Sequence, residues 1–175
     1  PSRISLRKSG RGQNAYEVHD EEVAAATSDY INKLGKDKLS GAFEGPVAIS
    51  VGLMLPHQPF VARKKDYDRY IGKIALPKIP PEPLDQCHPY IRWWRQRTGI
   101  EIVTEEEIIR ARTAYWALCD RTDHLLGTIL SSLETNGFLD NAIVIYTSDH
   151  GEQVGERGLW WKQTFYEHSS RVPAI

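Results

Sequence analysis

A long amphipathic helix that leads into an apolar run is the feature that most limits how this chain can fold. Thr104 and Glu107 fit a capping box, in which each side chain bonds the other residue's backbone amide. Apolar residues then recur on one helical stripe as far as Leu133, and Asn136-Gly137 suits a left-handed C-terminal turn. The apolar stretch "AIVIYTS" follows after a short connection and predicts a buried strand. Such a helix–strand unit is typical of an α/β fold with right-handed crossovers.

Earlier segments supply a second strand and a second helix. The run "PVAISVGLM" (46–54) is mostly apolar and predicts a buried strand that stops at the prolines of "LPHQPF". Residues 20–34 have helical spacing behind an acidic first turn, whereas residues 1–20 read as a loop or a broken end. Residues 61–103 show little periodicity and many prolines, which indicates an irregular excursion over the surface.

These segments together predict a mixed, largely parallel sheet flanked by helices. We expect residues 1–175 to form part of one domain. Its expected parts are a helical and loop segment (1–45), a strand with a histidine loop (46–60), the proline-rich excursion (61–103), a long helix (104–137), and a strand with its following loop (142–175).

Composition excludes several classes of protein. Charged residues make up 26% of the chain and the net charge is −1, so no basic surplus suggests binding to nucleic acid. No apolar run approaches the roughly 18 residues that indicate a membrane span. Cys87 and Cys119 form neither a disulfide framework nor a zinc-binding spacing, and Cys119 lies in the helical pattern as an expected core residue.

Chemically active side chains follow both predicted strands. His57 comes just after the first, and Asp149 and His150 come just after the second. In an open α/β sheet, ligands bind beyond the carboxyl ends of the strands, so parallel strands would bring these three residues to one edge. A carboxylate with an imidazole suits a divalent metal without selecting one. Lys162, on the loop after Gly151, could bind an anionic oxygen there.

Each of these residues also has a simpler interpretation. Asp149-His150-Gly151 could be turn chemistry, His57 an ordinary loop residue, and Lys162 a solvated surface charge. Trp160 and Trp161 favour packing over ligand contact. The shared position at one sheet edge favours a functional site, and composition alone leaves both interpretations open.

The final block, "IVIYTSDHGEQVGERGLWWKQTFYEHSSRVPAI", resembles the C-terminal signature of the sulfatase branch of the alkaline-phosphatase superfamily. It looks most like choline sulfatases, and "PHQPF" is similar to the family's His-x-Pro-Phe/Tyr segment. The resemblance implies that Asp149 and His150 coordinate a divalent cation, Ca²⁺ or Mn²⁺. It also implies that Lys162 contacts the sulfate, and that His57 binds the sulfate and protonates the leaving oxygen.

The sequence departs from this family at the nucleophile. In the family, a formylglycine is made from Cys or Ser in a Cys/Ser-x-Pro-x-Arg motif. Here "CHPYIR" matches at Cys87 and Pro89, but its arginine comes one place late, at Arg92, and the segment follows His57 instead of preceding it. We interpret Cys87 as a chance match. The family's early pair of metal-binding aspartates also has no counterpart, because Asp20 has a helical context. The formylglycine is therefore expected in an N-terminal segment outside this chain.

The leading hypothesis is part of a metal-dependent sulfuric-ester hydrolase that acts on a small sulfated ester. An alternative is a phosphonate monoester or phosphodiester hydrolase of the same superfamily, and a second is a non-catalytic fragment or pseudo-enzyme. The resemblance favours a cytoplasmic location, with the periplasm left open, and a homo-oligomer is compatible with the sequence.

Overall fold

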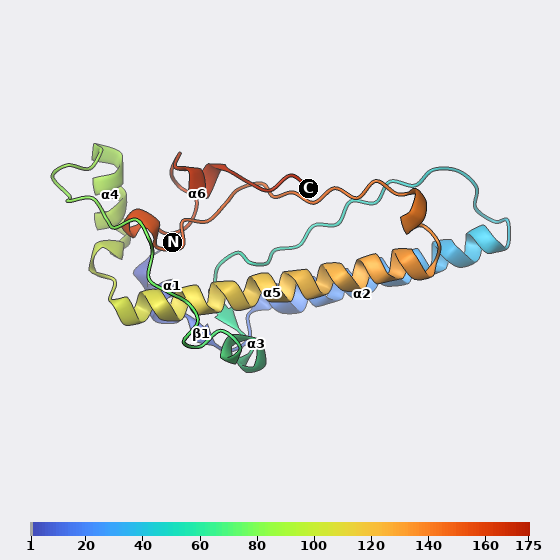
Figure 1. Cartoon of the computed structure of the whole chain (residues 1–175), viewed down its shortest axis with the longest axis horizontal. Coiled ribbons are helices and arrows are strands. Elements are labelled where there is room, and N and C mark those ends of the chain that lie inside the picture. Colours follow the sequence, from blue (N-terminus) through green and yellow to red (C-terminus); the bar gives the residue numbers. More distant parts are fainter. Residues whose placement is uncertain (1) are drawn as a thin grey trace.

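Two long helices form the base of the molecule in a computed structural model that describes residues 2–175 (Figure 1). Helices α2 (Ala15–Leu39) and α5 (Glu105–Thr135) lie side by side and run in the same direction. The predicted capping box begins α5: Glu107 N donates to Thr104 Oγ1 at 3.2 Å, and Thr104 N donates to Glu107 Oε2 at 3.0 Å. Gly137 follows the helix with a φ of 66°. The long-helix prediction is confirmed.

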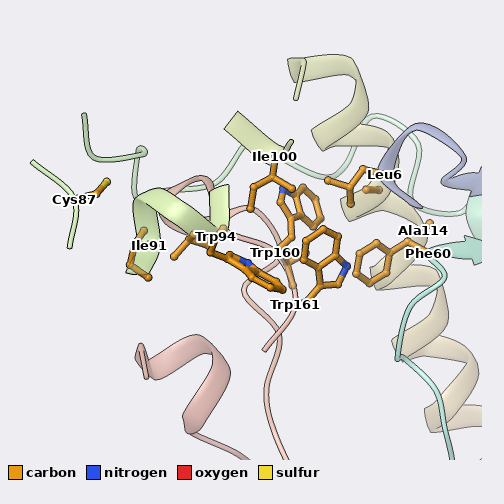
Figure 2. Close-up of a cluster of buried hydrophobic side chains, with 12 residues drawn as sticks. Leu6, Phe60, Cys87, Ile91, Trp94, Ile100, Ala114, Trp160 and Trp161 are labelled. Atoms are coloured by element: carbon orange, nitrogen blue, oxygen red, sulfur yellow. The ribbon is translucent and has the colours of Figure 1, made fainter. Parts of the chain in front are cut away.

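Buried side chains form two clusters along this base. The first lies between the helices and includes Ala24, Ile31, Ala117, Leu118, Leu125 and Ile129. The second gathers around the start of α5 and includes Leu6, Phe60, Trp94, Leu159, Trp160 and Trp161 (Figure 2). Trp160 and Trp161 are 1% and 2% exposed, which agrees with their predicted packing role.

The first 45 residues contain more regular structure than the sequence suggested. Helix α1 (Arg3–Arg7) and strand β1 (Gly10–Arg11) precede α2. Helix α2 starts well before the predicted position because the Asn14 side chain accepts a hydrogen bond from Glu17 N at 2.9 Å. The prediction of a loop up to residue 20 is therefore wrong.

The proline-rich region is also only partly irregular. It contains β2 (Val61–Ala62), α3 (Lys64–Asp68), α4 (Pro89–Thr98) and the 3₁₀ turn η1 (Ile100–Ile102). Strand β2 pairs in parallel with β1. The remaining short elements are η2 (Leu139–Asn141), η3 (Glu156–Gly158) and α6 (Glu167–Ser170). Within residues 2–175, none of the helices combines the length and the apolar character needed to cross a bilayer.

The two predicted strands run as extended segments without a sheet around them. Residues 46–54 and 142–146 pass back along the helical pair (Figure 1), and Ile143 and Ile145 are 92% and 75% exposed. A strand is stable when neighbouring strands pair with its backbone amides and carbonyls. In the described residues, the second segment pairs only with the short stretch at residues 174–175. Thr147 forms an isolated antiparallel bridge with Ala174. The prediction of buried strands therefore does not hold in this structure, which is α/β with a small parallel sheet.

The first extended segment is anchored to α2 by a buried carboxylate. Asp20 is completely buried and accepts hydrogen bonds from Met54 N at 2.9 Å and from Leu55 N at 2.8 Å. These contacts hold the chain immediately before His57. Since α2 and α5 point the same way, the segments that return from them end near each other.

Candidate active site

His57 and His150, the residues that end the two returning segments, lie next to each other. Their ring centroids are 5.9 Å apart, with an angle of 67° between the ring planes. Lys162 reaches the same place from the following loop, and its Nζ lies 2.6 Å from His150 Nε2. The fold thus brings together three residues that are far apart in the sequence.

Backbone contacts set the orientation of both imidazoles. His57 Nδ1 lies 2.8 Å from the carbonyl oxygen of Gln58, and His150 Nδ1 lies 2.7 Å from that of Gly151. A carbonyl can only accept, so each Nδ1 carries the proton and donates it. The neutral tautomer that fits this hydrogen bond has its lone pair on Nε2. For His150, this lone pair faces the Lys162 ammonium.

Asp149 lies at the edge of this group and remains largely open to solvent. Its side chain is 83% exposed, and its Oδ2 lies 3.6 Å from His150 Nε2. Desolvation works to raise the pKa of this carboxyl, but interactions with His150 and Lys162, together with backbone donors, bring the net pKa below its ordinary value. Asp149 is therefore an anion at neutral pH, beside the imidazole nitrogen.

Gly151 is required by a close approach between two parts of the chain. A Cβ at this position would lie 2.2 Å from the carbonyl oxygen of His168 in α6. The Gly151 amide donates to the carbonyl of Ser169 at 2.9 Å. Beyond the turn chemistry that its sequence context suggests, Gly151 lets the α6 segment pack directly against the backbone beside His150.

Glu152 is a partly buried carboxylate that sequence reasoning missed. Its Oε1 accepts hydrogen bonds from Val154 N at 3.2 Å and from Trp161 N at 2.5 Å, which closes the loop that carries Lys162. Burial raises the pKa of Glu152 to about 7, against the opposing effect of these amides. Only the fold buries this residue, so its position directly after Gly151 offered no signal.

Backbone strain and a second carboxylate shape the same loop. Val154, Arg157 and Trp161 have φ values of 47°, 58° and 67°, in the left-handed region that non-glycine residues rarely adopt. Glu156 accepts from the backbone amides of the proline-rich segment at Lys78 and Ile79, at 3.1 and 2.8 Å. Glu152 thus holds the loop to itself, and Glu156 holds it to the proline-rich segment.

A buried polar network supports the loop on the far side of Lys162. The Gln153 side chain is fully buried, and its Nε2 donates to Thr164 Oγ1 at 2.7 Å and to Ser169 Oγ at 2.9 Å. Ser169 Oγ also donates to the Thr164 carbonyl at 2.9 Å. These contacts fix where the chain turns after Lys162.

Cys87 has a structural environment away from this site. Cys87 is 4% exposed and belongs to the second core cluster (Figure 2). Arg95 Nη1 donates to its sulfur at 3.4 Å. The thiol packs beside Ile91 and Trp94 in the core cluster. This placement agrees with the interpretation of "CHPYIR" as a chance match.

The site has part of the donor set that a divalent cation needs. Asp149 provides carboxylate oxygens, and His150 has the Nδ1-anchored geometry that is typical of metal-binding histidines. Among residues 2–175, no group of three or more His, Cys, Asp or Glu side chains is arranged to hold a metal ion. Lys162 also occupies the lone pair of His150 Nε2. The pair fits a metal if the lysine moves aside and other ligands complete the shell.

Comparison with known proteins identifies the family. A family model described as Sulfatase matches residues 3–175. The choline-sulfatase of Rhizobium meliloti is 34% identical over 164 residues, which cover 90% of this chain and 31% of that protein. Arylsulfatase K of Bos taurus is 37% identical over 145 residues, which cover 74% of this chain and 26% of that protein. The chain thus spans less than a third of the length of these relatives.

Solved structures share the fold. The candidate sulfatase yidJ from Bacteroides fragilis superposes with a TM-score of 0.65 at 25% identity, over 89% of this chain and 30% of that one. The phosphonate monoester hydrolase SpPMH from Silicibacter pomeroyi superposes with a TM-score of 0.60 at 28% identity, over 69% and 26%. Two observations agree: these matches, and the convergence of His57, His150 and Lys162 at one place. The chain belongs to the sulfatase family.

Proposed function

We propose that this chain forms part of a metal-dependent hydrolase of sulfuric esters. The observation that carries the proposal is the convergence of an imidazole (His57), an imidazole with an adjacent carboxylate (His150 and Asp149) and an ammonium (Lys162) at one place. This combination provides a cation to bind an anionic ester, a candidate proton donor, and two ligands for a metal. The similarity to choline-sulfatase and arylsulfatase K supports sulfate esters as the substrate class.

Each residue has a role that its geometry supports. A bound Ca²⁺ or Mn²⁺ would supply Lewis-acid stabilisation of charge on the ester oxygens, with Asp149 and His150 among its ligands. The Lys162 ammonium neutralises the anionic sulfate. His57, whose Nδ1 is held by the Gln58 carbonyl, presents Nε2 toward the site, and in the doubly protonated imidazolium form this atom can deliver a proton to the leaving oxygen. The nucleophile proposed for this reaction is a formylglycine from a segment outside this chain.

Metal analysis of the full-length protein tests the proposed ligands. We expect the double variant Asp149→Ala/His150→Ala to lose the bound divalent ion, measured by elemental analysis after dialysis. The chain offers a matched control in Asp123-His124, an exposed Asp–His pair on α5, whose double alanine variant should keep the ion. Equal metal content in both variants would refute the assignment of Asp149 and His150.

A phosphonate monoester hydrolase is the second candidate function. It is favoured by the fold shared with SpPMH at 28% identity. Comparing kcat/KM of the full-length protein for an aryl sulfate and for the matching aryl phosphonate monoester separates the two functions. We expect the sulfate ester to be preferred, and a preference for the phosphonate by orders of magnitude would reverse the choice.

A further inference from the structure

A cavity of about 460 Å³ lies beside His57. Ser2, Ile4, Ser5, Tyr16, His57, Gln58 and Pro59 line it. His57 is the residue that this cavity shares with the candidate active site. The centroid of its ring lies 5.9 Å from that of His150 and 5.8 Å from that of Tyr16. Helix α1 and the start of α2 thereby line a cavity that the sequence did not indicate.

The position of the cavity matters because of the proposed role of His57, on which this inference rests. A proton donor must lie roughly 2.6–3.2 Å from the oxygen that it protonates. The leaving oxygen carries the organic part of the ester, so the first carbon atoms of that part must lie close to the His57 ring. We propose that the cavity lined by Tyr16 and Ile4 binds the organic part of the ester, and that this part is uncharged.

The size and lining of the cavity support this assignment. Its volume falls within the roughly 300–1,000 Å³ that is usual for small-molecule pockets. Tyr16, Ile4 and Pro59 provide apolar contact, whereas the two serines and Gln58 provide hydrogen-bonding groups.

The absence of charge in the lining selects against ionic groups. None of the described residues that line the cavity is Asp, Glu, Lys or Arg. A quaternary ammonium group is recognised by several aromatic faces together or by a carboxylate, and Tyr16 provides one phenol ring here. His57 uses its proton for the leaving oxygen, so a carboxylate on the substrate would lose hydration without meeting a Lys or Arg side chain in the described lining. A neutral ring or a neutral polyol has no ionic group that needs a charged partner in the cavity.

Three aryl sulfates of equal size test the proposal on the full-length protein. They carry a neutral hydroxymethyl group, a trimethylammonium group or a carboxylate at the same ring position. We expect kcat/KM to be about tenfold higher for the neutral ester than for either charged one. Ile4, which is 59% exposed, can then be changed to Glu without loss of core packing. We expect Ile4→Glu to raise the preference for the cationic ester relative to the neutral one by about tenfold.

Ile71→Glu is the matched control, because Ile71 is 48% exposed and lies outside the cavity. This variant should leave the preference unchanged. The inference is overturned if Ile4→Glu alters the preference no more than Ile71→Glu, or if the wild type prefers a charged ester. If none of the esters is hydrolysed, the proposed function itself fails. Binding of the free alcohols, followed by saturation-transfer NMR, then still decides whether the cavity prefers a neutral group and whether Ile4→Glu reverses that preference.

Discussion

The buried carboxylate of Asp20 should control the order of the chain just before His57. Asp20 accepts a hydrogen bond from Leu55 N at 2.8 Å. The amide of Met54 donates to both carboxylate oxygens of Asp20, at 2.9 Å each. A hydrogen bond to a charged group contributes roughly 1.5–3 kcal/mol. Asp20→Ala leaves both amides without an acceptor, so the local cost is about 3–6 kcal/mol for the pair.

Hydrogen–deuterium exchange measures this effect directly. A loss of about 1.5–3 kcal/mol at one amide corresponds to roughly 10–150-fold faster exchange, since 1.36 kcal/mol is a factor of ten. We expect this acceleration at Leu55 in the full-length Asp20→Ala protein. Asp20→Asn keeps one acceptor oxygen and should show a smaller change. Glu22→Ala, at an exposed position on the same helix, is the control. Unchanged exchange at Leu55 in Asp20→Ala would refute the anchoring argument.

Three further predictions concern the site loop and a thiol. Gly151→Ala would set a Cβ 2.2 Å from a carbonyl oxygen of α6, so we expect a loss of about 1–3 kcal/mol in thermal unfolding, whereas Gly127→Ala, with open space around it, should not destabilise. Burial raises the pKa of Cys119 to about 12, so its iodoacetamide labelling at pH 8 should be at least about 100-fold slower in the folded protein than in urea, and equal rates would contradict this burial. Glu156→Ala removes the acceptor of the Lys78 amide, so trypsin should cut after Lys78 faster than in wild type, and an unchanged digestion pattern would argue against a role of Glu156 in holding this segment.

Local signals in the sequence predicted the elements that depend on local chemistry. The capping box at Thr104 and Glu107 needs only residues three positions apart, and the helix starts there as expected. We expected His57 and His150 to meet because two parallel strands would end at one edge of a sheet. The two segments are extended and lie outside any sheet, but they run the same way and end side by side, so the two rings are neighbours. The direction of the two segments was therefore predicted, whereas their pairing into a sheet was not.

Features that depend on distant parts of the chain could not be predicted. Burial of Glu152 arises from a loop that folds back to Trp161, and the Tyr16 cavity joins α2 to the segment around Gln58. The strand predictions for 46–54 and 142–148 used hydrophobicity, which says that a segment suits a sheet but not whether neighbours are present to pair with it. The early start of α2 depends on the cap at Asn14, whose side chain accepts a hydrogen bond from Glu17 N.

The exposed segment around Ile143 and Ile145 has a consequence for handling the isolated chain. The run "AIVIYTS" has high β-propensity and contains no charge, proline or glycine, which is the composition of segments that assemble into cross-β fibrils. Its backbone hydrogen-bonding groups are largely open to other chains. Asp140 and Asp149 flank the run and can act as gatekeepers against such assembly. We therefore expect residues 1–175 alone to show concentration-dependent thioflavin-T fluorescence, which Ile143→Lys should suppress.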